Sequence, residues 1–157
     1  MTFKIINADV LEGLRGIADG SVDCCVTSPP YWGLRDYGVA GQIGLEKTPE
    51  EFIARLAGVF REVRRTLADD GTLWVNMGDS YNSPGPSNHG KSKEVHRGTN
   101  DAGWVQGIKT KRVENLKPKD LCGIPWMLAF ALRSDGWYLR QDIIWSKPNP
   151  MPESVTD

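Results

Sequence analysis

The sequence predicts one α/β domain built on an open, mostly parallel sheet. Short apolar runs alternate along the chain with segments whose apolar residues recur at helical spacing. Parallel strands need crossover connections, and the intervening helical segments supply them. The 157 residues suffice for one hydrophobic core, and 39% hydrophobic with 25% charged residues is ordinary for a soluble globular protein.

The first part of the chain predicts a strand, a helix and a second strand. Residues 3–7 form the first expected strand, and residues 9–17 form the helix that follows. One face of that helix is apolar and carries Val10, Leu11 and Leu14. Residues 22–27 are an apolar run bounded by turn formers, so we expect a short buried strand there.

The clearest helix signals begin at Thr48. Thr48 can cap the helix, Pro49 suits the first helical position, and Glu51 completes a capping box. Residues 69–71, Asp-Asp-Gly, are expected to end the helix. The apolar residues at helical spacing are Phe52, Leu56, Val59, Phe60, Val63 and Leu67.

Two strands and one helix are expected in the remaining periodic segments. Residues 72–77 are mostly apolar and predict a third strand buried on both faces. Residues 119–134 predict a helix in which Pro125 marks a kink or a restart. Asp135-Gly136 should end it, and residues 137–145 predict a fourth strand. The inward positions of the helix are Leu121, Ile124, Leu128 and Leu132.

Residues 80–117 differ in composition from the rest. They are rich in Gly, Ser, Asn and Pro, and residues 87–117 hold seven Lys or Arg against three acids. Such a segment is either a solvated surface loop or a phosphate-contacting arm that orders on DNA, with Trp104 as a stacking group. Composition alone supports both interpretations equally. The candidate phosphate contacts are Lys91, Lys93, Arg97, Lys109, Lys111 and Arg112.

Charge, hydropathy and cysteine content exclude several classes of protein. The net charge of −1 excludes a general polycation, so any nucleic-acid contact must come from a local patch. No apolar run approaches membrane-spanning length, and the first residues begin no signal peptide. The three cysteines have neither disulfide nor metal-ligand spacing. We therefore expect a reduced, cytoplasmic setting and no metal or membrane.

The most informative residues follow the second expected strand. Ser28-Pro29-Pro30-Tyr31, the Ser-Pro-Pro-Tyr motif, joins a hydroxyl, two prolines that lack an N–H, and an aromatic ring. This stiff, acceptor-rich edge suits a planar ligand with an amino group, such as a nucleobase. Ligands in parallel sheets bind beyond the carboxyl ends of the strands. The alternative is a rigid turn with a half-buried aromatic residue.

The motif resembles the catalytic motif of amino-group DNA methyltransferases, in the serine form most often seen in cytosine-N4 enzymes and found in some adenine-N6 enzymes. Residues 33–38, 71–81 and 142–150 resemble the same family in the same order. The resemblance implies an incomplete, doubly wound, mostly parallel sheet of the S-adenosylmethionine-dependent methyltransferase type. It also implies methylation of a flipped base in double-stranded DNA, cytosine N4 favoured over adenine N6, in a restriction-modification system.

The resemblance also suggests roles for individual residues. Ser28 and Pro29 would accept the two amino hydrogens of the base, Pro30 would stiffen the loop, and Tyr31 would stack on the base. Asp9 resembles the acidic position near the adenine of S-adenosylmethionine, and Ser28 also lies on the cofactor side. A helix N-cap is an equally supported role for Asp9. Further candidates to line the crevice, without assigned roles, are Trp145, Lys147 and Asn149.

One family feature is absent from the sequence. In the permuted class that the chain resembles, a glycine-rich Phe-x-Gly-x-Gly cofactor motif follows the catalytic half, and no such sequence occurs in residues 1–157. We therefore expect residues 1–157 to be the N-terminal catalytic portion, with a basic insertion at about 80–117 and an unpaired sheet edge that favours self-association. The rival hypotheses are a catalytically incompetent DNA-binding remnant and one half of a split methyltransferase.

Overall fold

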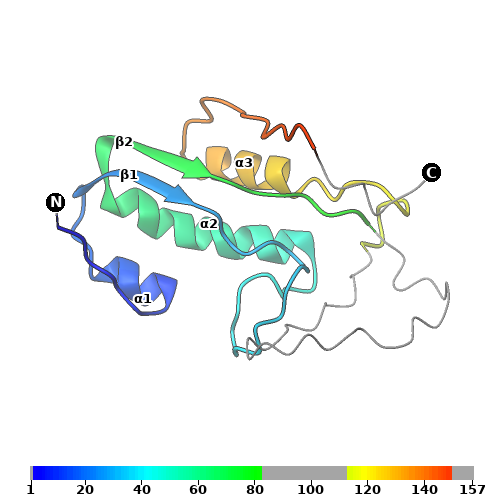
Figure 1. Ribbon diagram of the computed structural model, residues 1–157, viewed down its shortest axis with the longest axis horizontal. Coiled ribbons are helices and arrows are strands. Elements are labelled where there is room, and N and C mark those ends of the chain that lie inside the picture. The colour runs from blue at the N-terminus through cyan, green and yellow to red at the C-terminus, as the bar shows by residue number, and fades with distance from the viewer. Residues whose placement is uncertain (1, 83–112, 150–157) are drawn as a thin grey trace.

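The computed structural model describes residues 2–82 and 113–149, which form an α/β arrangement (Figure 1). The elements follow one another as α1 (Val10–Arg15), β1 (Val22–Thr27), α2 (Pro49–Thr66), β2 (Leu67–Val75) and α3 (Ile124–Ser134). β1 and β2 pair in parallel, and α2 is the helix of the crossover between them. The expected α/β class with a parallel sheet is confirmed at this level.

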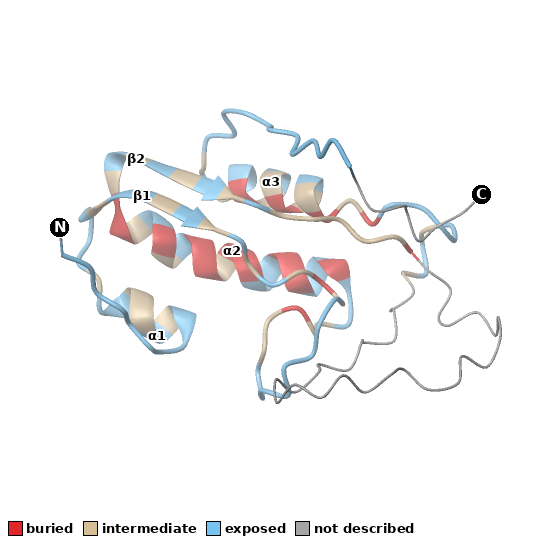
Figure 2. Cartoon of the chain, viewed as in Figure 1, coloured by how far each residue is buried: buried red, intermediate tan, exposed pale blue. Residues whose placement is uncertain are grey.

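The two-stranded sheet has one covered and one open face. Its inner side chains, among them Cys25 and Leu73, pack against the core formed by α2 and α3. On the outer face Val26 is 77% exposed and its cross-strand partner Trp74 is 51% exposed. Figure 2 shows the same division of the strands into half-buried and exposed residues. The expectation of buried strands is therefore wrong for the outer face, because both packing helices lie on the inner face.

α2 forms the centre of the core. The Thr48 hydroxyl accepts a hydrogen bond from the Glu51 N–H at 3.2 Å, and the Glu51 carboxylate accepts one from the Lys47 N–H at 3.0 Å. The predicted cap and apolar face are confirmed, but the helix ends at Thr66 rather than at residues 69–71. Leu67 already pairs with Val22, so the sheet takes the chain out of the helix earlier. The buried apolar residues of α2 are Pro49, Phe52, Ile53, Leu56, Ala57, Val59, Phe60 and Val63.

α3 begins five residues later than the sequence predicts. Gly123, in the left-handed conformation, precedes it, and Pro125 stands in its first turn, so the proline marks a start rather than a kink. Leu121 lies before the helix and is 44% exposed, which corrects its expected inward position. The other predicted inward residues, Ile124, Leu128 and Leu132, are buried.

Two of the expected strands are not strands. Residues 3–7 and 137–145 are extended or irregular chain, and Phe3 and Tyr138 are each 88% exposed. A strand is stable only when its N–H and C=O groups pair with a neighbour, and within the described residues neither segment has a neighbouring strand. The apolar pattern at these positions is therefore exposed.

Arginines on α2 hold the loops around it. Arg65 donates to the carbonyls of Leu14 at 2.8 Å and Ile17 at 3.0 Å, which ties the end of α1 to the end of α2. Arg61 forms a salt bridge with Asp135 at 2.7 Å, just after α3. The same end of α2 carries a surface cleft lined by Arg61, Arg64, Arg65 and Asp135.

The buried side chain of Asn82 joins the end of the first described range to residues 113–117, at the start of the second. The Asn82 amide donates to the carbonyls of Val113 at 3.1 Å, Leu116 at 2.8 Å and Lys117 at 3.2 Å. Its Oδ1 accepts from the Val113 N–H at 2.9 Å, and Asn82 is 0% exposed. One side chain therefore fixes where the chain leaves and where it returns.

We expect Asn82→Ala to destabilise the 157-residue chain, because it removes the partner of the part-buried Val113 N–H and of the part-buried Leu116 carbonyl. An unpaired buried polar group costs about 1–3 kcal/mol, so the free energy of unfolding should fall by about that amount in urea denaturation. Asn76→Ala is the matched control, since Asn76 is exposed and only its backbone N–H bonds, to the Thr27 carbonyl. Equal midpoints for the two variants would contradict the role assigned to Asn82.

Candidate active site

The Ser-Pro-Pro-Tyr motif begins where β1 ends. β1 ends at Thr27, so the motif leaves the sheet at the carboxyl edge of a parallel strand. Ser28 and Pro30 are exposed, whereas Pro29 and Tyr31 are half-buried. The hydroxyl of Ser28 is therefore open to an incoming ligand, while the ring of Tyr31 rests against the protein.

The Tyr31 ring packs against Gly78, three residues beyond the end of β2. A Cβ atom placed on Gly78 would lie 2.7 Å from Cε2, 3.2 Å from Cδ2 and 3.3 Å from Cζ of the ring. The ring therefore occupies the space that any side chain at position 78 would need. Because β1 and β2 are parallel, their carboxyl ends meet at one edge and bring these two residues together.

A second glycine supports the other side of the motif. Gly44 has a φ of +103°, and a Cβ there would lie 2.9 Å from the Tyr31 carbonyl oxygen. Its own carbonyl accepts a hydrogen bond from the Gly33 N–H at 2.8 Å. Trp32 is 4% exposed, and its indole N–H donates to the Glu46 carbonyl at 3.1 Å. The loop of residues 33–48 is thereby folded back onto the motif.

Asp79 connects this edge of the sheet to α3. Its Oδ2 accepts from the Gly123 N–H at 2.9 Å, and its Oδ1 accepts from Ile124 at 3.0 Å and from Ser80 at 2.8 Å. Gly123 has no side chain with which to cap the helix, so a carboxylate from another element caps it. Burial, and then the charge of Asp79, raise the pKa of the neighbouring Cys122 thiol, which keeps that thiol protonated.

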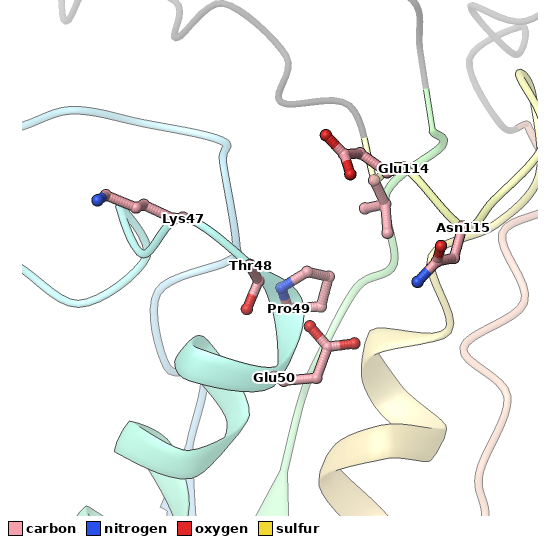
Figure 3. Close-up of a pocket in the computed structure, with 7 residues that line it drawn as sticks. Lys47, Thr48, Pro49, Glu50, Glu114 and Asn115 are labelled. Atoms are coloured by element: carbon pink, nitrogen blue, oxygen red, sulfur yellow. The ribbon is translucent and has the colours of Figure 1, made fainter.

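A cleft lies where α2 begins, beside the residues that follow the undescribed segment. In Figure 3 the side chains of Glu50 and Asn115 point toward one another across it, whereas Lys47 points away. The lining contains none of residues 28–31, so the cleft is a neighbour of the motif and not its pocket. The full lining is Lys47, Thr48, Pro49, Glu50, Val113, Glu114 and Asn115.

The other predicted site residues are not gathered around the motif. Asp9 caps α1, its Oδ1 accepting from the Leu11 N–H at 3.0 Å, and within residues 2–82 and 113–149 its side chain forms no other hydrogen bond. Trp145, Lys147 and Asn149 are exposed on irregular chain. The predicted phosphate contacts Lys91, Lys93, Arg97, Lys109, Lys111 and Arg112 lie outside the described residues.

Three neighbours of the motif had no role in the sequence analysis. Gly44, Gly78 and Asp79 contact the motif or hold its neighbours. Gly78 and Asp79 come directly after the expected strand of residues 72–77, and this position was a visible signal for them. In residues 2–82 and 113–149 no group of acidic, histidine or cysteine side chains could hold a metal ion. No helix in the same ranges is long and apolar enough to cross a membrane.

Comparison with known proteins finds relatives along nearly the whole chain. The type II methyltransferase M.SmaI of Serratia marcescens is 54% identical over 154 residues, which are 98% of this chain and 51% of that protein. M.Cfr9I of Citrobacter freundii is 52% identical over 98% of this chain and 49% of its own length. M.MwoI of Methanothermobacter wolfeii is 43% identical over 98% of this chain and 18% of its own length.

The chain spans about half the length of the first two of these relatives. No solved structure matches it. The model of a family described as DNA methylase, which covers N6 and N4 methyltransferases, matches residues 22–157 and so includes both strands and the Ser-Pro-Pro-Tyr motif. On this match, the chain belongs to the N6/N4 DNA methylase family.

Proposed function

We propose that the chain carries the catalytic part of a site-specific DNA methyltransferase. It would transfer a methyl group from S-adenosylmethionine to the exocyclic amine of a flipped base, cytosine N4 in preference to adenine N6. The observation that carries the proposal is the Ser-Pro-Pro-Tyr motif at the carboxyl end of β1, with an exposed Ser28 and a supported Tyr31, in a chain of this family. The relatives named as type II methyltransferases support site-specific action on DNA.

The residues of the motif suit the chemistry of an amine that is a poor nucleophile. Its lone pair is delocalised into the ring of the base and must be turned toward the methyl donor. The Ser28 hydroxyl and the Pro29 carbonyl would accept the two amino hydrogens and stabilise the positive charge that develops on nitrogen. The donor would supply the methyl group, its sulfur keeping the electron pair of the carbon–sulfur bond, and the methylated amine would release one proton to water.

Tyr31 would hold the base outside the duplex. Flipping a base out of the stack costs about a few kcal/mol, which stacking on an aromatic ring and hydrogen bonds in the pocket offset. Cytosine N4 is favoured because serine, rather than aspartate, precedes the two prolines. No cysteine follows a proline in the chain, so the thiolate nucleophile of a carbon-5 cytosine methyltransferase has no counterpart.

Asp9 fits the proposed contact with the adenine of S-adenosylmethionine. Its Oδ1 caps α1, which leaves Oδ2 of an exposed carboxylate free to accept from an amino group. The helix cap and the cofactor contact are thus compatible on one side chain. When bound, S-adenosylmethionine would supply the electrophilic methyl group. Ser28 would lie between the cofactor and the base.

The open sheet face and the basic residues between positions 91 and 112 also fit a DNA methyltransferase. The open outer face of the sheet, with Val26 and Trp74 exposed, suits the second helix layer of a doubly wound methyltransferase sheet. The basic residues between positions 91 and 112 would contact phosphates of double-stranded DNA. A restriction endonuclease of the same specificity would be the partner of such an enzyme.

A second candidate is a DNA-binding remnant without activity, or one half of a split enzyme. It is favoured by the sequence, which contains no Phe-x-Gly-x-Gly motif, and by the open sheet face. For a remnant, titration of the 157-residue chain with S-adenosylmethionine in a calorimeter should give no heat of binding. Binding in the micromolar range would rule the remnant out.

The modified nucleoside identifies the target base. Duplex DNA methylated by the full-length enzyme, then digested and analysed by mass spectrometry, should contain N4-methylcytosine, because the serine form of the motif favours that amine. N6-methyladenine alone would overturn the assignment of the base. The absence of both products would contradict an amino-group methyltransferase.

Substitutions in the motif separate catalysis from folding. Ser28→Ala removes an acceptor that acts in the transition state, so kcat should fall by about 10²-fold with little change in cofactor affinity. Tyr31→Ala should lower both turnover and retention of the flipped base, measured by 2-aminopurine fluorescence at the target position. Ser21→Ala is a control, because Ser21 lies just before the opposite end of β1 and its hydroxyl donates to the Ala18 carbonyl, far along the strand from the motif. Near-normal turnover in both motif variants would reduce the motif to a structural turn.

A further inference from the structure

We propose that Gly78 and Asp79 are positioning residues that set the orientation of the Tyr31 ring. The effect on turnover rests on the proposed function, in which Tyr31 stacks on the target base. The arrangement itself rests on contacts between three segments: the end of β1, the turn after β2, and the start of α3.

Gly78 leaves open the space that the Tyr31 ring occupies. The three ring atoms nearest to its absent Cβ are consecutive carbons, Cδ2, Cε2 and Cζ, at 2.7–3.3 Å from that position. Real Cβ atoms essentially never approach as closely as 2.7 Å, so any larger residue at 78 requires a shift. Gly78 does not have a positive φ, so the need for glycine there is steric and comes from the ring.

The backbone around Gly78 is held at both ends. On the strand side the Asn76 N–H donates to the Thr27 carbonyl at 2.9 Å, which continues the pairing of the two strands to the base of the motif. On the other side the Asp79 carboxylate receives the backbone N–H groups of Gly123 and Ile124. Gly78 lies between these two attachments and has little freedom to retreat from the ring.

Asp79 links the turn after β2 to the buried helix α3. α3 is anchored by Ile124 and Leu128, which are 1% and 3% exposed. A carboxylate at a helix N-terminus is stabilised by its charge-assisted hydrogen bonds and by the helix dipole. Pro125 has no N–H to donate. The Asp79 carboxylate accepts from the two backbone N–H groups just before it, those of Gly123 and Ile124. The chain of contacts therefore runs from the core through α3, Asp79 and Gly78 to Tyr31.

The first experiment is Gly78→Ala in the full-length enzyme labelled with 3-fluorotyrosine. The fluorine resonance of Tyr31 is assigned with Tyr31→Phe. The added methyl group should push the ring aside, shift this resonance, and leave the melting temperature unchanged, because a ring at the end of a rotatable side chain can move. Turnover should fall by about tenfold, on the scale of a lost base–aromatic contact, with the KM for S-adenosylmethionine unchanged.

The matched control is Gly58→Ala in α2, where an added Cβ meets nothing within 4 Å. It should change neither the Tyr31 resonance nor turnover. An unchanged Tyr31 resonance in Gly78→Ala would overturn the proposal. A shifted resonance with normal turnover would overturn its catalytic consequence. A wild-type enzyme that methylates no amine would instead defeat the proposed function, while the resonance would still report on the position of the ring.

The second experiment is Asp79→Asn, with Asp70→Asn as its control. The amide replaces one acceptor oxygen with a donor that faces an N–H, so the turn should loosen and the Tyr31 resonance should shift or broaden. Asp70 is exposed, and its side chain forms no hydrogen bond or ion pair with the part of the chain that the structure describes, so its substitution should leave the resonance unchanged. A lower melting temperature with an unmoved Tyr31 resonance would make Asp79 a helix cap alone and overturn its positioning role.

Discussion

The parallel pairing of β1 with β2, closed by α2 on one face, is the constraint on which the rest of the structure depends. Parallel strands end at the same edge, so the pairing places the residues after Thr27 beside the residues after Val75. The α2 crossover makes that pairing sterically accessible, and its buried face supplies much of the apolar area that holds the strands in register. Without this pairing, Tyr31 and Gly78 would not meet.

The loops at this edge are ordered by polar groups that come from distant positions. Asp79 caps α3 across 44 residues of sequence, and the Asn82 amide bonds to Val113 across 31. Trp32 bonds to the Glu46 carbonyl, so the segment between the motif and α2 is also tied down. A buried carboxylate or amide has to be paired, and each such pairing also fixes the two segments that it joins. In the candidate site, Tyr31 is therefore held by the residues packed against it, whereas Ser28 is exposed.

The open face of the sheet and the family relationship both favour a sheet that is covered on its two faces in the proposed methyltransferase. Val26 and Trp74 expose large apolar surfaces, and apolar side chains before α1 and after α3 are exposed as well. Exposed large apolar side chains of this kind suit packing against further structure. The relatives M.SmaI and M.Cfr9I are about twice as long as this chain. A sheet covered on both faces is the arrangement expected for the proposed methyltransferase.

The sequence by itself determined the features that depend on neighbouring residues: the cap and apolar face of α2, the bounds of β1 and the family motif. The cap, the apolar face and the strand follow from local geometry and side-chain periodicity, whereas the motif was identified by its resemblance to a family. Tertiary structure decided whether an apolar run became a strand, since residues 3–7 and 137–145 carry the pattern but have no strand to pair with among the described residues. It also decided that Asp79 caps α3 and that Gly78 supports Tyr31. Such contacts join segments that no local pattern relates, because only the folded sheet brings their ends together.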